Sequence, residues 1–200
     1  MSEHYYAKDP KVKSQPKDWS AELRGNKLHF KTDAGVFSKG EVDFGSRLLV
    51  ESFVMPEVEG NILDVGCGYG PIGLTIAVSF PERNVHMIDV NERALALSVH
   101  NAERNGLSNT TIYSSDALSA VKENNFAAIL TNPPIRAGKD TVFTFYEDSL
   151  SKLQSGGQLW VVIQKKQGAP STAKHLEEIF GNVETIAKKK GYFIFRAVKN

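Results

Sequence analysis

Short apolar runs alternate with helical patterns along most of the chain, beginning at residue 61. The apolar runs have the length of buried strands, whereas the segments between them repeat their apolar residues with helical spacing. Strands that alternate with helices in this way predict an α/β protein with a mostly parallel sheet. We expect seven strands, over residues 61–65, 85–89, 110–113, 126–130, 158–163, 183–187 and 192–198, and helices over residues 71–78, 91–105, 141–153 and 171–180, with a short helix near Leu118.

The two ends of the chain depart from this alternation. Residues 188–191 leave no room for a crossover helix between the last two predicted strands, so the last strand should be antiparallel. Near the N-terminus, Gly25-Asn26 separates residues 21–24 from residues 27–30, which predicts a small hairpin with a two-residue turn. A helix should follow over residues 44–54.

Length and charge fit a single domain. Two hundred residues suffice for one domain with a substantial core, which we expect over residues 21–200, with residues 21–43 as a hairpin and a covering loop. Residues 1–20 form a polar, lysine-rich arm that is either solvated or in contact with RNA. Because 24 Lys and Arg nearly balance 23 Asp and Glu, a nucleic acid would have to be met by a local patch.

Several kinds of protein are disfavoured by the sequence. Cys67 is the single cysteine, which excludes an internal disulfide framework and a multi-cysteine metal site. The five histidines have no metal-ligand spacing. No apolar run approaches the roughly 18–20 residues that span a bilayer, and the N-terminus lacks the apolar centre of a signal peptide. We therefore expect a cytoplasmic enzyme or binding protein without metal or membrane, of undetermined oligomeric state.

A glycine-rich stretch, from Leu63 to Gly73, connects the first predicted strand of the sheet to a helix. Glycines let the backbone turn sharply and approach a ligand without a Cβ clash. The helix N-terminus adds N–H donors that suit a carboxylate or phosphate. Asp89 ends the next strand, sixteen residues after Gly73, where a carboxylate can accept both hydroxyls of a ribose. Together these features predict a nucleoside-bearing cofactor.

Two residues disfavour NAD as that cofactor. Gly68-x-Gly70-x-x-Gly73 matches the dinucleotide fingerprint, which is a weak signal by itself. Asp64 just before the glycines would repel a pyrophosphate but could meet a cationic amino-acid moiety, and Pro71 removes an N–H donor. Asp116 ends a third strand, where it could pair with an adenine edge or simply cap a helix.

The sequence Asn132-Pro133-Pro134-Ile135 follows the buried run 126–130. Neither proline has an N–H to donate, so both end the strand ladder. The strand end therefore carries a stiff loop with an amide side chain and carbonyls that lack local donors. Such a loop can accept hydrogen bonds from an amino group, which indicates chemistry on an amine.

These motifs resemble, as a set, those of class I S-adenosylmethionine-dependent methyltransferases. More narrowly, residues 33–200 look like the small-domain ribosomal RNA guanine exocyclic-amine (N2) methyltransferases of the small subunit, to which residues 35–38 and 101–105 are also similar. The resemblance implies a Rossmann-like fold, S-adenosyl-L-methionine as cofactor, and ribosomal RNA or the small ribosomal subunit as partner. The implied cofactor residues are Phe37, Ser38, Asp64, Gly66, Cys67, Gly68, Tyr69, Gly70, Asp89, Val90, Asp116, Ala117 and Asn132, and the implied catalytic loop is Asn132, Pro133, Pro134 and Ile135.

Ile135 departs from the pattern, because relatives often carry an aromatic residue there to stack on the flipped base. Phe37, Phe44 or Tyr192 could supply the stacking instead, although Phe37 could also be a core anchor. Arg136 and Lys139 are candidate contacts to RNA phosphates, or solvated charges. Residues 188–190, three consecutive lysines, form a second candidate patch or an exposed turn.

Other functions stay open at this stage. A protein glutamine-amide methyltransferase would also offer an NH2 group to the loop, but such enzymes usually have tyrosine at the position of Ile135. A small metabolite could be the methyl acceptor. An NAD-dependent oxidoreductase and a non-catalytic RNA-binding module with a vestigial pocket lie outside the class.

Overall fold

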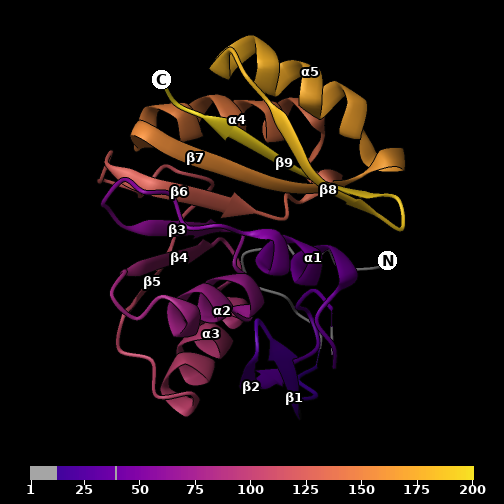
Figure 1. The fold of residues 1–200 in the computed structure, drawn as a ribbon. Helices are drawn as coiled ribbons and strands as arrows, with labels where there is room; N and C mark the ends of the chain where they lie inside the picture. Colours follow the sequence, from indigo (N-terminus) through magenta and orange to yellow (C-terminus); the bar gives the residue numbers. More distant parts are fainter. Residues whose placement is uncertain (1–12, 39) are drawn as a thin grey trace.

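A seven-stranded sheet runs through the centre of the molecule (Figure 1). The structure is a computed structural model that describes residues 13–38 and 40–200. The strand order is β5-β4-β3-β6-β7-β9-β8, and β9 is antiparallel to both of its neighbours while the other large-sheet pairs are parallel. This arrangement confirms the predicted Rossmann-like sheet with an antiparallel last strand.

The elements follow the predicted alternation, with differences at their ends. The strands are β1 (Lys17–Leu23), β2 (Asn26–Thr32), β3 (Ile62–Val65), β4 (Val85–Asp89), β5 (Thr110–Ser114), β6 (Phe126–Thr131), β7 (Leu153–Gln164), β8 (Glu184–Lys189) and β9 (Tyr192–Val198). The α-helices are α1 (Phe44–Ser52), α2 (Pro71–Ser79), α3 (Glu92–Arg104), α4 (Lys139–Lys152) and α5 (Ala169–Phe180), and the 3-10 helices are η1 (Ile135–Ala137) and η2 (Lys165–Gln167).

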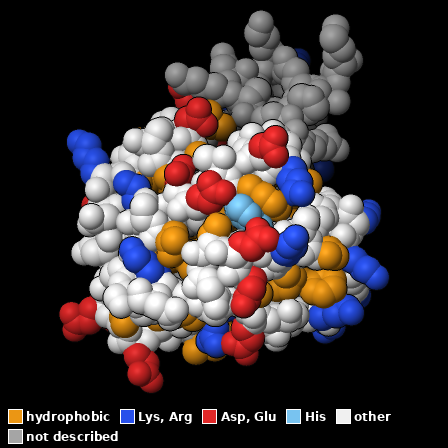
Figure 2. Space-filling view, turned by 90° about the horizontal axis from the view of Figure 1, so that it is seen from above, with side chains coloured by type: hydrophobic (Ala, Val, Ile, Leu, Met, Phe, Trp, Pro, Cys, Tyr) orange, Lys and Arg blue, Asp and Glu red, His pale blue; other side chains and the backbone are white. Residues whose placement is uncertain are grey.

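Helices cover both faces of the sheet. Helices α1, α2 and α3, together with the β1–β2 hairpin, lie against one face, and α4 and α5 lie against the other (Figure 1). The face over α4 and α5 carries charges of both signs scattered among small apolar patches (Figure 2). None of the helices in the described part of the chain combines the length and apolarity needed to cross a membrane.

The parallel strands end at one level, which brings their following loops together. Val65 is paired with Thr131 on one side and with Ile88 on the other, and Asp89 is paired with Ser114. The chain order reverses between β3 and β6, and ligands of α/β proteins bind at such a reversal, beyond the carboxyl ends of the strands. The glycine-rich stretch and the Asn-Pro-Pro sequence therefore meet at this point of the sheet.

The hairpin turn is displaced by one residue from its predicted position. Leu23 is paired with Asn26, so the turn residues are Arg24 and Gly25, both with positive φ (50° and 73°), and not Gly25-Asn26. The Arg24 guanidinium donates to the Val50 and Phe53 carbonyls at the end of α1, at 2.7 and 2.8 Å. These long-range bonds compensate for the unfavourable backbone conformation of a non-glycine residue.

Three further predictions are corrected. Strand β1 begins at Lys17, so residues 17–20 of the predicted arm belong to the hairpin. Residues 1–12 of that arm lie outside the described residues. The segment near Leu118 forms turns and not a helix. Strand β7 begins at Leu153, because a bulge between its pairings to Phe126 and Ala128 accommodates the extra residues that were predicted to precede the strand.

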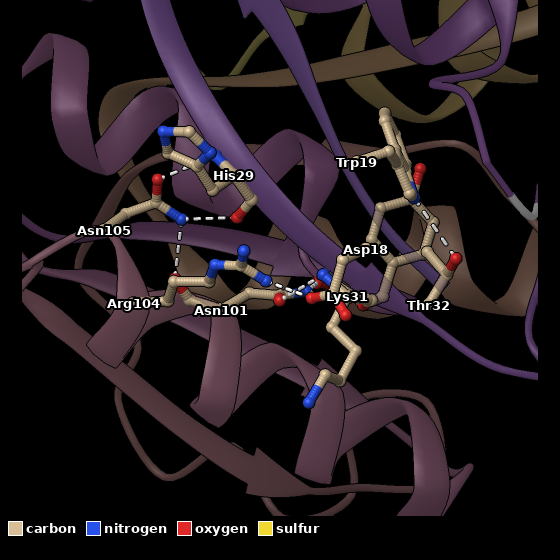
Figure 3. A network of polar contacts seen from close by, with 9 residues as sticks. Asp18, Trp19, His29, Lys31, Thr32, Asn101, Arg104 and Asn105 are labelled. Carbon is tan, nitrogen blue, oxygen red and sulfur yellow. Dashed lines mark hydrogen bonds and ion pairs between the residues drawn. The ribbon is translucent and has the colours of Figure 1, made fainter. Parts of the chain in front are cut away.

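Asn101 of α3 and Asn105, which caps the end of this helix, bind the free edge of strand β2 (Figure 3). Asn101 accepts from the Lys31 N–H at 2.7 Å and donates to the Lys31 carbonyl at 3.0 Å. Asn105 makes the same pair of bonds to His29, at 2.9 and 2.7 Å. The match is geometric, because helix positions four apart and strand positions two apart both advance about 6–7 Å. The ion pair between Arg104 and Asp18 reinforces the contact.

We expect Asn101→Ala to lower the free energy of unfolding by about 2–4 kcal/mol, since it would leave several partly or fully buried backbone groups unpaired. Asn101 is fully buried and also donates to the Tyr69 carbonyl at 2.9 Å. Urea unfolding would measure the change. The control is Asn84→Ala, which removes an exposed hydrogen bond between a half-buried amide and Thr111 and should cost about 0.5 kcal/mol or less. Equal losses in the two variants would contradict the structural role of Asn101.

Candidate functional site

A cavity of about 290 Å³ lies where the chain order reverses, at the carboxyl edge of the sheet. Its walls come from the glycine-rich loop, from the ends of four strands, from the loop before α1, and from α4. Predicted site residues in the lining are Phe37, Gly66, Cys67, Gly68, Tyr69, Asp89, Val90, Asp116, Ala117, Asn132, Pro133 and Pro134. The sequence did not indicate several other lining residues, among them Ser46, Thr131, Val142 and Phe145.

The glycine-rich loop is fastened to the end of β4. The Gly66 and Cys67 N–H groups both donate to the Ile88 carbonyl at 2.9 Å. Asp89 accepts from the Gly68 N–H at 2.8 Å and from the Asn91 N–H at 2.9 Å. A carboxylate has about four acceptor sites, so Asp89 retains capacity for hydroxyl groups of a ligand. Burial raises the pKa of Asp89 despite these hydrogen bonds.

Asp64 lies behind the glycine-rich loop and outside the cavity lining. Its side chain is 1% exposed, and Oδ2 accepts from the Gly73 N–H at 2.8 Å. Among the described residues nothing donates to Oδ1. Burial raises the pKa of Asp64 to about 7, an effect that the Gly73 hydrogen bond opposes and the nearby Asp89 charge increases.

Asn132 is held with a defined orientation at the cavity. Its Nδ2 donates to the Ser46 hydroxyl at 3.1 Å and to the Asp43 carboxylate at 3.3 Å. A carboxylate only accepts, so this contact fixes which end of the Asn132 amide is nitrogen. Nothing in the described part of the chain donates to Oδ1, which leaves it available as an acceptor. Asp43 is itself the N-cap of α1, with Gly45 N–H at 3.0 Å.

The rest of the Asn-Pro-Pro-Ile loop divides between the cavity and the core. Pro133 and Pro134 line the cavity, and no described residue donates to the Pro133 carbonyl. Ile135 instead packs against the apolar core beneath α4. Lys139 is exposed with its Nζ 4.9 Å from the Phe143 ring centroid. Arg136 belongs to η1, and its side chain is not described.

The loop that covers the cavity is anchored from α3. Asn91 donates to the Gly35 carbonyl at 3.1 Å, and Arg93 donates to the Ala34 carbonyl at 2.7 Å. These bonds place Phe37, which is 42% exposed, at the edge of the cavity. Ser38 does not line the cavity, and its hydroxyl donates to the Glu41 carbonyl at 2.8 Å.

The end of β5 forms the remaining wall. Asp116 and Ala117 are exposed and line the cavity, with Ala117 at φ 46°. Asp116 is not a helix cap, because turns follow it, and the Ser115 hydroxyl receives the Ala120 N–H at 3.1 Å. The neighbouring Val142 and Phe145 give this wall apolar surface that suits a flat ring.

Cys67 is a buried residue of the cavity lining, with Sγ 3.8 Å from the Ser98 hydroxyl. Burial raises the pKa of its thiol well above the usual value, with the charges of Asp89 and Asp64 adding to the effect. A thiol held in its neutral form is a poor nucleophile. Within the described ranges no group of three or more His, Cys, Asp or Glu side chains could hold a metal ion.

The parallel sheet with an antiparallel last strand, the glycine-rich loop and the Asn-Pro-Pro loop define a class I methyltransferase. The chain belongs to the methyltransferase small domain family, whose model matches residues 27–196. This match confirms the family predicted from the sequence motifs.

Three similar proteins carry most of the comparison. YbxB of Bacillus subtilis, an uncharacterised protein, is 60% identical over 200 residues and is covered completely, as is this chain. Ribosomal RNA small subunit methyltransferase C of Vibrio parahaemolyticus is 35% identical over 92% of this chain and 53% of its own length. The T. thermophilus 16S rRNA N2 G1207 methyltransferase, solved with AdoMet and guanosine, superposes with a TM-score of 0.83 and 29% identity over 96% of this chain and 52% of its own. The chain thus spans about half the length of these two methyltransferases.

The raised pKa of Asp64 predicts a stability that decreases as the pH increases. In the unfolded chain this carboxyl loses its proton near its ordinary value of 3.8, but in the fold it does so at about 7. The folded state therefore binds more protons between these values, so its stabilising contribution is complete below pH 4 and is lost by pH 7. One proton corresponds to a slope of about 1.4 kcal/mol per pH unit.

Denaturant unfolding from pH 4 to pH 8 would measure this slope in the wild type and in Asp64→Asn. Asparagine retains an acceptor for the Gly73 N–H and cannot ionise, so the variant should lack this component. The matched control, Asp148→Asn, removes an exposed carboxylate of α4 and should retain it. Identical slopes for the wild type and Asp64→Asn would contradict the assignment.

Proposed function

We propose that this protein is an S-adenosyl-L-methionine-dependent methyltransferase that acts on an exocyclic amine of RNA, with guanine N2 of small-subunit ribosomal RNA as its specific acceptor. The observation that carries the proposal is the Asn132 amide, whose nitrogen is held by Asp43 and Ser46 so that its oxygen remains an acceptor. The ribosomal acceptor is supported by the names of the related methyltransferases. The enzyme would work in the cytoplasm on the RNA or on the small subunit.

The cavity fits the proposed cofactor in its polarity. Asp89 has acceptor capacity for the ribose, and the wall of Asp116, Ala117 and Phe145 offers a polar edge beside apolar surface for the adenine. Gly66 and Gly68 have positive φ, and nothing lies within 4 Å of a Cβ built on either, so the loop can meet a ligand closely. Asp64 Oδ1, to which no described residue donates, lies behind this loop and would add negative potential suited to a cationic amino-acid end.

When bound, S-adenosyl-L-methionine supplies an electrophilic methyl group on its sulfonium. The protein's task is to hold the amine nitrogen in line with that methyl group. Asn132 Oδ1 and the Pro133 carbonyl would accept both N–H groups, which directs the nitrogen lone pair toward the methyl. The same two oxygens would stabilise positive charge on the nitrogen as the C–N bond forms and the methyl–sulfur bond breaks, with S-adenosylhomocysteine as the leaving group. The nitrogen would then lose a proton to solvent, so no strong base is needed beforehand.

Incubation with labelled cofactor would test the acceptor directly. Small ribosomal subunits and their free RNA, taken from cells that lack this gene, should accept label, and nuclease digestion should release it as N2-methylguanosine. Subunits from cells that carry the gene should accept little, because the site is already methylated. Label found only in protein would refute the RNA proposal and favour a glutamine amide, which offers a similar NH2 group.

Asn132→Ala should lower kcat about 100-fold or more, since it removes an oriented acceptor from the reacting nitrogen.

Asp43→Asn should lower kcat about 10- to 100-fold, because an amide at position 43 no longer dictates which end of Asn132 is nitrogen. Asparagine caps helices as well as aspartate, so the free energy of unfolding should change little.

A variant that carries both Asp43→Asn and Asn132→Ala tests whether Asp43 acts by orienting Asn132 or has an independent effect on kcat. If Asp43 acts through Asn132, Asp43→Asn should have almost no further effect on kcat in the Asn132→Ala background. Binding of S-adenosylhomocysteine, followed by calorimetry, should remain within a few-fold of the wild type in Asp43→Asn. Additive losses in kcat would contradict the orienting role.

A further inference from the structure

Four lysines form a basic rim on the same edge of the sheet as Asn132. Lys165 and Lys166 begin η2 directly after β7, and Lys189 and Lys190 end β8 and begin its turn into β9. Strands β7 and β8 are both antiparallel to β9, so they run in the same direction as β6. The carboxyl ends of β7 and β8 therefore lie at the same edge of the sheet as the carboxyl end of β6, which Asn132 follows. Lysine and arginine side chains, drawn in blue, gather along the right-hand margin of the molecule in Figure 2.

The two segments that carry the basic rim are connected by a backbone hydrogen bond and enclose a hollow. The Lys165 N–H donates to the Gly191 carbonyl at 2.8 Å, which fastens η2 to the β8–β9 turn. Between them lies a hollow of about 310 Å³, lined by Gln164, Lys165, Lys166, Lys190 and Gly191. All four lysines are exposed, and none forms an ion pair with a carboxylate of the described residues. Like charges gathered without counter-charges indicate an anionic partner.

The rim is continuous with the candidate site. Lys190 Nζ lies 4.9 Å from the Phe44 ring centroid, and Tyr192 lies 5.4 Å from the same ring. The packing is close, since a Cβ built on Gly45 would lie 2.8 Å from Tyr192 Cε1. Phe44 and Gly45 directly follow Asp43, whose carboxylate holds Asn132. Two half-buried rings therefore connect the lysines to the residue that would receive the amine.

We propose that the basic rim binds the backbone phosphates of unpaired RNA next to the target nucleotide, with Phe44 and Tyr192 along the path to the cavity. This inference rests on the proposed function, because it assigns the surface that presents RNA to that site. Lysines bind phosphates as point charges and without reading sequence, so the rim supplies affinity and register and not base choice. Since the whole chain carries a formal net charge of only +1, attraction to RNA must come from such a local surface.

The test compares two triple variants that remove the same charge. Lys165→Gln/Lys166→Gln/Lys190→Gln removes three of the four rim charges, and Lys27→Gln/Lys122→Gln/Lys174→Gln neutralises three exposed lysines elsewhere. Each full-length protein, saturated with S-adenosylhomocysteine, is titrated with a single-stranded RNA oligonucleotide from 50 to 300 mM salt. The slope of log Kd against log salt should be shallower by about 2 in the rim variant, since each lost single-strand phosphate contact removes about 0.7.

The control variant should retain the wild-type slope, and the melting-temperature increase caused by S-adenosylhomocysteine should be the same in all three proteins. Equal slopes in the rim and control variants, or a wild type that does not bind the RNA, would overturn the proposal. These binding measurements need no turnover. A wild type that binds RNA through the rim but transfers no methyl group would refute the proposed function and leave the docking surface intact.

Discussion

The buried carboxamide of Asn101 joins three parts of the chain on which the site depends. It pairs with both backbone groups of Lys31 on β2 and donates to the Tyr69 carbonyl in the glycine-rich loop. The hairpin alone is too small to be stable, and two strands need a packing partner. Asn101 and Asn105 bind the backbone of β2 as a third strand would, and they thereby attach the hairpin to α3 as its packing partner. The Trp19, Phe30 and Tyr69 rings then pack together over the same loop.

Asn132 has the same side chain as Asn101, but the two amides differ in how many of their polar atoms form hydrogen bonds within the described part of the protein. The Asn101 amide uses both its oxygen and its nitrogen within the protein, so its contribution is structural. Among the described residues the Asn132 amide uses only its nitrogen, which is held by a carboxylate that can only accept. A side chain with one end fixed and the other unpaired is prepared to bind a ligand group of defined polarity. The contrast follows from the neighbours of each amide and could not be read from residue type.

The sequence predicted the sheet well because buried parallel strands are continuous apolar runs, as in 126–130, and these need no tertiary context to be recognised. It failed where a distant contact decides the local structure. Gly25-Asn26 was the expected turn, but Arg24 occupies the first turn position because its guanidinium binds the end of α1. Asp43 was missed for a similar reason. An aspartate before a helix is an ordinary N-cap signal, and its second role depends on Asn132, 89 positions away.

Acidic and basic side chains lie at different places along one edge of the sheet, although the net charge of the chain is close to zero. Asp89 lines the cavity and Asp64 lies behind the glycine-rich loop, and burial raises the pKa of each. The lysines of the basic rim lie at the ends of β7 and β8, where Lys190 and Tyr192 both contact the Phe44 ring. Under the proposed function, the cofactor is a cation and the RNA acceptor is a polyanion, so each would be attracted to a different charged surface. In the proposed function, placing these charges apart would let both ligands approach one edge, with the amine of the acceptor entering near Asn132.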